Sequence, residues 1–100
     1  MKPERTRILL IVGSNIVECH RTARAFGLDL TKVGSMRTVT RPYALRSWSR
    51  GTPFIALNRD SWPETLDRAL DALTRTGQLR IANEKDLEDL REEEGLAHAG

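Results

Sequence analysis

The sequence predicts a small α/β domain of about four parallel strands in the order βαβαβαβα. Three observations support this class: an unbroken apolar run at residues 8–12, helical hydrophobic patterns between the predicted strands, and turn residues at the segment ends. Alternating strands and helices are typical of a parallel sheet with right-handed crossovers and helices on both faces. We therefore expect three layers, with the strands in the spatial order 2-1-3-4.

The first strand and the helix after it carry the clearest pattern. Residues 7–12 read Arg-Ile-Leu-Leu-Ile-Val, and a continuous aliphatic run is typical of a strand covered on both faces. Gly13 ends this strand, Ser14 or Asn15 caps the following helix, and Gly27 closes that helix. The residues expected on the packed face of the helix are Ile16, Cys19, His20, Ala23 and Phe26.

The middle of the chain is expected to hold two further strands and a short helix. Residues 33–40 form a weaker second strand, and residues 52–57 form a third. Pro42 suits a first helical position, so residues 42–48 are expected to be a short helix. Residues 58–60 then form a loop.

The second half is expected to hold two helices with a short strand between them. Ser61 and Glu64 have the spacing of a capping box, and Gly77 ends the amphipathic helix that follows. Residues 79–82 form the fourth strand, and Asn83 caps the last helix.

The two ends of the chain are expected to be flexible. Residues 1–6 are polar, Gly95 is expected to stop the last helix, and residues 96–100 then form a tail. No linker, repeat or low-complexity block divides the sequence. Residues 1–100 are therefore predicted to form a single α/β domain of Rossmann-like or flavodoxin-like type.

Composition and hydropathy restrict the class of protein. Hydrophobic residues make up 39% and charged residues 30%, which is typical of a globular chain. The longest apolar run, Ile8 to Val12, is far shorter than the ~18 residues of a membrane span. The first residues also lack the apolar segment of a signal peptide. We expect a cytoplasmic protein with no membrane partner.

The net charge of +2 conceals an asymmetry along the chain. Residues 1–60 contain eleven Lys and Arg against four Asp and Glu, whereas residues 61–100 contain five against ten. The first part is therefore near +7 and the second near −5. This asymmetry is compatible with a basic face for a polyanion, with pairing of the two parts, or with stacking on a neighbouring copy.

No constellation of residues predicts catalysis or metal binding. Cys19 and His20 are adjacent, so on a helix their side chains point about 100° apart and do not form a nucleophilic pair. Cys19 is the only cysteine, which leaves no zinc-binding spacing. The acidic run of residues 86–94 lacks a calcium-loop pattern. We expect Cys19 to be a core residue, His20 a boundary residue, and the protein to need no cofactor or metal and to be no enzyme.

The candidate ligand site lies at the carboxyl edge of the predicted sheet. At the turn after the first strand, free backbone N–H groups and the positive end of the helix dipole favour an anion. Other strand ends add polar side chains at this edge, and the strand order places a topological switch point between the first and third strands. The residues expected to bind a phosphate-bearing ligand are Gly13, Ser14, Asn15, Arg41, Asn58 and Arg59.

A structural interpretation of the same residues stays open. The sequence has neither the Walker lysine nor a G-x-G-x-x-G pattern, so the turn also fits a simple helix cap. Arg59 would then pair with Asp60 or Glu64, and Arg41 would be solvated.

A second candidate surface comes from the arginine-rich and aromatic middle of the chain. Arginine binds phosphates and aromatic rings stack on bases, whereas Trp, Tyr and Arg are also enriched in protein interfaces. Alternatively, the tryptophans anchor the core. The residues expected to form a protein or nucleic-acid interface are Tyr43, Arg46, Trp48, Arg50 and Trp62.

The order of motifs along the chain resembles that of a group of small phage proteins. These motifs are the first strand, the Gly13-Ser14-Asn15 turn, the helix ending at Gly27-Leu28, the segment 41–57 and Trp62. The phage proteins are uncharacterised proteins of actinobacterial phages and prophages, which are similar to a pared-down Rossmann or P-loop domain. The resemblance spans residues 7–82 and implies a phage accessory protein that keeps the fold without the chemistry. It carries over no functional residue.

Three functions follow as hypotheses. The first is a non-enzymatic binding module that acts through a protein partner or through self-association as a homo-oligomer. The second is a degenerate nucleotide- or phosphate-ligand-binding domain that uses the carboxyl edge. The third is a nucleic-acid-binding accessory protein that uses the arginine- and tryptophan-rich middle segment.

Overall fold

The computed structural model describes residues 8–31 and 35–99, with side-chain surroundings described to residue 92. The sheet has four parallel strands in the order β2-β1-β3-β4. Their bounds are β1 (Leu9–Val12), β2 (Met36–Val39), β3 (Thr52–Ala56) and β4 (Leu79–Ile81). The predicted α/β class and strand order are confirmed. The expectations for residues 1–6, for Arg7 in the first strand, for residues 33–34 in the second strand and for Gly100 lie outside the described residues.

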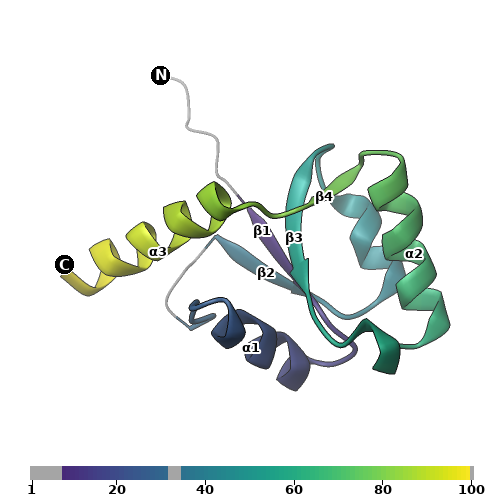
Figure 1. Ribbon diagram of the computed structural model, residues 1–100, viewed down its shortest axis with the longest axis horizontal. Coiled ribbons are helices and arrows are strands. Elements are labelled where there is room, and N and C mark those ends of the chain that lie inside the picture. Colours follow the sequence, from purple (N-terminus) through teal and green to yellow (C-terminus); the bar gives the residue numbers. More distant parts are fainter. Residues whose placement is uncertain (1–7, 32–34, 100) are drawn as a thin grey trace.

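Helices cover both faces of the sheet (Figure 1). Helices α1 (Ile16–Ala25) and α3 (Glu84–Ala99) lie on one face. The 3₁₀ helix η1 (Pro42–Ser47) and helix α2 (Glu64–Arg75) lie on the other. A further 3₁₀ turn, η2 (Arg59–Ser61), joins β3 to α2. In the described part of the chain, no helix is both long and apolar enough to cross a membrane.

Strand β1 lies inside the sheet and explains the apolar run of the sequence. Its side chains alternate between the two layers because successive residues of a strand face opposite sides. Leu9 and Ile11 pack in the α1 and α3 layer, whereas Leu10 and Val12 pack in the α2 layer. All four residues are buried, so both faces of β1 must be apolar.

The capping box predicted at Ser61 and Glu64 does not form, which corrects the sequence prediction. Helix α2 begins at Glu64, and the Ser61 hydroxyl instead donates to the Asn58 carbonyl at 2.9 Å. A residue before proline is sterically driven to extended backbone, and Trp62 has ψ 155° before Pro63. The helix therefore starts after Pro63. Arg59 and Asp60, predicted as part of a loop at residues 58–60, form η2 together with Ser61.

Two further sequence expectations are wrong. Helix α3 continues past Gly95 to Ala99, because glycine costs a helix only about 1 kcal/mol relative to alanine and no proline follows. The predicted tail at residues 96–100 is thus helical as far as Ala99. Ile16 is 50% exposed rather than packed, although Cys19 and Ala23 on the same helix are buried.

The cap predicted at Asn83 does form and gives the first testable prediction. The Asp86 N–H donates to Asn83 Oδ1 and the Asn83 N–H donates to Asp86 Oδ2, both at 2.9 Å.

We expect Asn83→Ala to lower the free energy of unfolding by about 1 kcal/mol, measured by urea denaturation. Ser61→Ala, a matched control without a helix cap to lose, should cost less than half as much. An equal or larger loss in Ser61→Ala would contradict the assignment of the caps.

Candidate functional site

The residues predicted to bind a ligand lie along one edge of the sheet. Val12 of β1 is level with Val39 of β2 and Ala56 of β3, so these three strands end together. The turn at residues 13–15, Arg41 and the segment 58–59 follow those ends directly. Strand β4 stops short of this edge, since its last residue, Ile81, is level with Phe54 in the middle of β3.

The turn after β1 holds a carboxylate of the protein itself. Oε1 of Glu18 accepts the Ser14 backbone N–H at 2.6 Å and the Ser14 hydroxyl at 3.0 Å. Asn15 is the N-cap of α1, and its Oδ1 accepts the Glu18 N–H at 2.9 Å. A Cβ at Gly13 would lie 3.1 Å from Glu18 Oε1 and 3.2 Å from Cys19 Sγ, so glycine permits this close approach. The chemical preference of the turn for an anion is met by Glu18.

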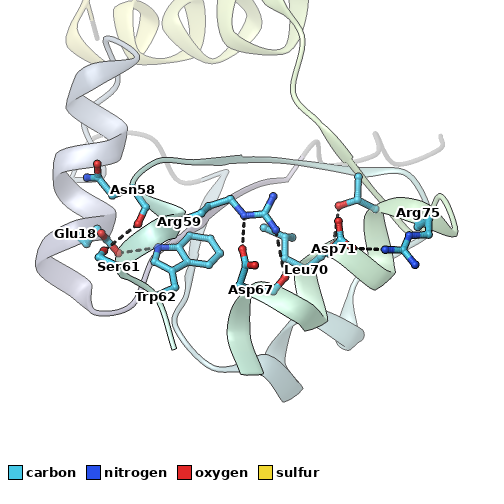
Figure 2. A network of polar contacts seen from close by, with 10 residues as sticks. Glu18, Asn58, Arg59, Ser61, Trp62, Asp67, Leu70, Asp71 and Arg75 are labelled. Carbon is cyan, nitrogen blue, oxygen red and sulfur yellow. Dashed lines mark hydrogen bonds and ion pairs between the residues drawn. The ribbon is translucent and has the colours of Figure 1, made fainter. Parts of the chain in front are cut away.

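Trp62 donates a further hydrogen bond to the same Glu18 carboxylate. Its indole Nε1–H donates to Glu18 Oε1 at 3.1 Å, although the two residues are 44 positions apart (Figure 2). The Trp62 side chain is only 7% exposed and packs in the α2 layer. The contact joins the first turn of α1 to the segment before α2, next to the predicted switch point between β1 and β3. The Glu18 and Trp62 side chains therefore occupy the end of the β1 turn, where a ligand anion was predicted.

Arg59 is fixed beside Trp62 and does not pair with the residues the sequence suggested. Its Nε donates to Asp67 Oδ1 at 2.7 Å and its Nη2 to the Asp67 carbonyl at 3.2 Å (Figure 2). The guanidinium carbon lies 5.6 Å from the centroid of the Trp62 ring, within cation–π range. The partner is therefore Asp67, one turn inside α2, and neither Asp60 nor Glu64.

Asn58 and Arg41 have different surroundings at this edge. Asn58 has a left-handed backbone (φ 57°), and its carbonyl accepts the Ser61 N–H at 3.0 Å. Asn58 is therefore a turn residue that directs the chain from β3 into η2. Arg41 is exposed; its carbonyl accepts the Ala44 N–H at 3.1 Å, and its guanidinium has no hydrogen bond or ion pair within the described residues.

The second predicted set does not form one surface. Tyr43 is 73% exposed on η1, and Arg46 is exposed near the end of the same helix. Trp62 is instead buried at the carboxyl edge. Trp48 and Arg50 precede β3 and thus lie near the opposite, amino edge.

At that amino edge, Trp48 and Arg50 border a hollow of about 440 Å³. Trp48 packs partly against the α2 layer, and its buried Nε1–H has no hydrogen-bond partner in the described part of the chain. The Arg50 Nη2 donates to the Thr76 carbonyl at 2.7 Å. These contacts tie the segment before β3 to the end of α2.

Cys19 is buried in the core as expected. Its Sγ–H donates to the Ile11 carbonyl at 3.4 Å, and the side chain is fully buried. Burial, and to a lesser degree the nearby Glu18 carboxylate, raise the pKa of Cys19 to about 11. His20 is half-buried on the same helix. Across the described residues, no three His, Cys, Asp or Glu side chains gather as metal ligands would.

The residue that sequence reasoning missed here is Glu18. Asn15 and Glu18 have the spacing of a capping box, in which a glutamate at the third helical position reaches back to the start of the helix. That signal alone could have identified Glu18 as an intramolecular occupant of the turn. Its contact with Trp62 had no local signal, because the two residues are distant in sequence.

Comparisons with protein-family models, with curated proteins and with solved structures found no match to this chain.

The carboxylate at the turn gives a prediction for stability. Glu18→Ala leaves the Trp62 indole and the Ser14 amide without their acceptor, so we expect the free energy of unfolding to fall by about 1–3 kcal/mol. Glu64→Ala is the matched control, because Glu64 is an exposed glutamate in the first turn of α2 and its one ion pair with a residue that the structure describes is with exposed Arg68. It should change stability by less than about 0.5 kcal/mol. Chemical denaturation measures both, and equal losses would contradict the role of Glu18.

The raised pKa of Cys19 gives a prediction for thiol reactivity. At pH 8 a free thiol of pKa ~8.5 is about one quarter thiolate, whereas a pKa of about 11 leaves about 0.1%. Alkylation by iodoacetamide should therefore be at least ~100-fold slower in the folded protein than in denaturant. Because the folded pKa lies above the unfolded one, this thiol should also cost stability as pH rises from ~8.5 toward 11. Similar alkylation rates in both states would contradict the buried thiol.

Proposed function

We propose that this domain is a non-enzymatic binding module that recognises a protein partner, or a second copy of itself, through the carboxyl edge of its sheet. The observation that carries the proposal is where the exposed large apolar side chains lie. Among the described residues these are Ile16, Val17, Tyr43 and Ile81, with exposed fractions of 50%, 58%, 73% and 68%. Ile16, Val17 and Tyr43 lie within five residues after the ends of β1 and β2, and Ile81 ends β4, two residues short of the level at which β3 ends. Apolar exposure gathered at one edge is typical of an interaction surface.

The polar groups of the edge support the same proposal. Trp, Tyr and Arg are the residue types that most often anchor protein interfaces, and Tyr43 and Arg41 lie two positions apart in this surface. The Arg41 guanidinium has no partner in the described part of the chain, so it is available to an acidic or carbonyl group of a partner. The resemblance to phage proteins is compatible with an accessory role of this kind.

The two alternative functions have less support. A phosphate ligand would need the N–H of the turn, but Ser14 already donates to Glu18. A ligand at a hundred times its Kd stabilises a fold by about 2.7 kcal/mol, so a thermal-shift panel of nucleotides tests this alternative directly. Nucleic-acid binding would use Arg41 and Arg46, and it would weaken steeply with salt.

The edge gives a prediction for association. Light scattering after size-exclusion chromatography, and capture of partners on the immobilised protein, should show a homo-oligomer or a retained partner. Ile16→Glu and Tyr43→Glu should each weaken that association at least about tenfold, because a charge then enters an apolar contact. Ala72→Glu, exposed on α2 away from this edge, is the matched control and should leave association unchanged.

Two results would count against the proposal. A strict monomer that retains no partner at ~0.1 mM, a concentration that detects Kd values up to that order, would contradict an interaction module. Equal loss in Ala72→Glu and in the edge variants would contradict the assignment of the surface to the carboxyl edge.

A further inference from the structure

A hollow of about 260 Å³ lies beside the carboxyl ends of β3 and β4. Phe26 from the end of α1 and Ile55 from β3 form apolar walls, and exposed Ile81 adds a third. Ala56 at the end of β3 and Ala82 just after β4 also border it, so small side chains leave the space unfilled. Of the residues around this hollow, Ile81 alone is also one of the exposed apolar residues of the protein-binding proposal above.

The path of α3 explains why no helix fills the hollow. In this architecture a helix that follows a strand commonly packs back over it. Figure 1 shows α3 running away from β3 and β4 instead, toward the edge of the sheet that β2 forms. Its Leu87 and Leu90 pack in the cluster that contains Leu9 and Met36, and Arg91 Nη2 donates to the Phe26 carbonyl at 2.7 Å.

One charged residue, Arg59, lines the hollow. Its contacts with Asp67 and with the Trp62 ring hold the side chain in place (Figure 2). Those hydrogen bonds use Nε and Nη2, so Nη1 has no hydrogen bond to the residues that the structure describes. A fixed guanidinium with a free N–H beside apolar walls is suited to a carboxylate that carries an apolar group.

We propose that the hollow binds a small carboxylic acid whose apolar part is about the size of one aromatic ring. The volume is just below the range of drug-sized sites, which limits the ligand to about ten non-hydrogen atoms. The apolar group lies against Phe26, Ile55 and Ile81, and the carboxylate lies toward Arg59. Ligands of open α/β sheets commonly bind outside the carboxyl ends of the strands, where this hollow lies.

The test is an NMR titration of the isotope-labelled full chain with phenylacetate and, separately, with its neutral amide, phenylacetamide. Phenylacetate should saturate in the millimolar range expected for so small a ligand and should shift the methyl signals of Ala56, Ala82 and Ile81. The amide should bind about tenfold more weakly, because it lacks the charge-assisted bond to Arg59.

Two variants assign the result to the hollow. Arg59→Gln should remove the preference for the acid over the amide, and Ala82→Phe should fill the space and weaken both probes. Equal affinity of the acid and amide for the unmodified protein would overturn the proposal, as would shifts that do not saturate or that lie elsewhere. That comparison needs no variant, so it decides the question even if a substitution unfolds the chain. It is also independent of the association experiment on Ile16 and Tyr43.

Discussion

The structure of the carboxyl edge of this domain depends on the hydrogen bonds that the Glu18 carboxylate accepts. One oxygen accepts hydrogen bonds from the Ser14 amide, the Ser14 hydroxyl and the Trp62 indole. Each donor is at least partly withdrawn from water, so an unpaired donor would cost more than the hydrogen bond itself contributes. Gly13 leaves room for the carboxylate, and Asn15 caps the helix that positions it. The contact also ties the two helical layers together at the point where β1 and β3 end.

This arrangement alters what the edge can do. In nucleotide-binding members of this architecture, the same turn presents its N–H groups to a ligand phosphate. Here an internal anion takes that position, and Trp62 covers it. The groups left for recognition are the exposed apolar side chains and Arg41, together with the hollow beside Arg59. Recognition by surface contact, rather than by capture of a phosphate, is consistent with this set.

Local patterns in the sequence were sufficient for the fold. The apolar run before Gly13 predicts a doubly covered strand, and the βα alternation predicts a parallel sheet in the order found. At the two helix boundaries that were predicted wrongly, a competing local effect was decisive: Pro63 moved the start of α2 past Ser61, and Gly95 was too weak a breaker to end α3. The sequence placed the candidate site at the carboxyl edge of the sheet. It did not predict that Glu18 and Trp62 occupy this edge, because their contact joins residues 44 positions apart.

Hydrogen exchange of the Trp62 indole proton, followed by NMR, tests the central claim most directly. The account predicts strong protection of this proton in the unmodified protein and its loss in Glu18→Ala. The buried Trp48 indole proton, which has no hydrogen bond to Glu18, reports the general loss of stability in Glu18→Ala, so the Trp62 proton should lose more protection than the Trp48 proton. A Trp62 indole proton that exchanges freely in the unmodified protein, or equally in the two proteins, would contradict the claim that Glu18 and Trp62 close this edge.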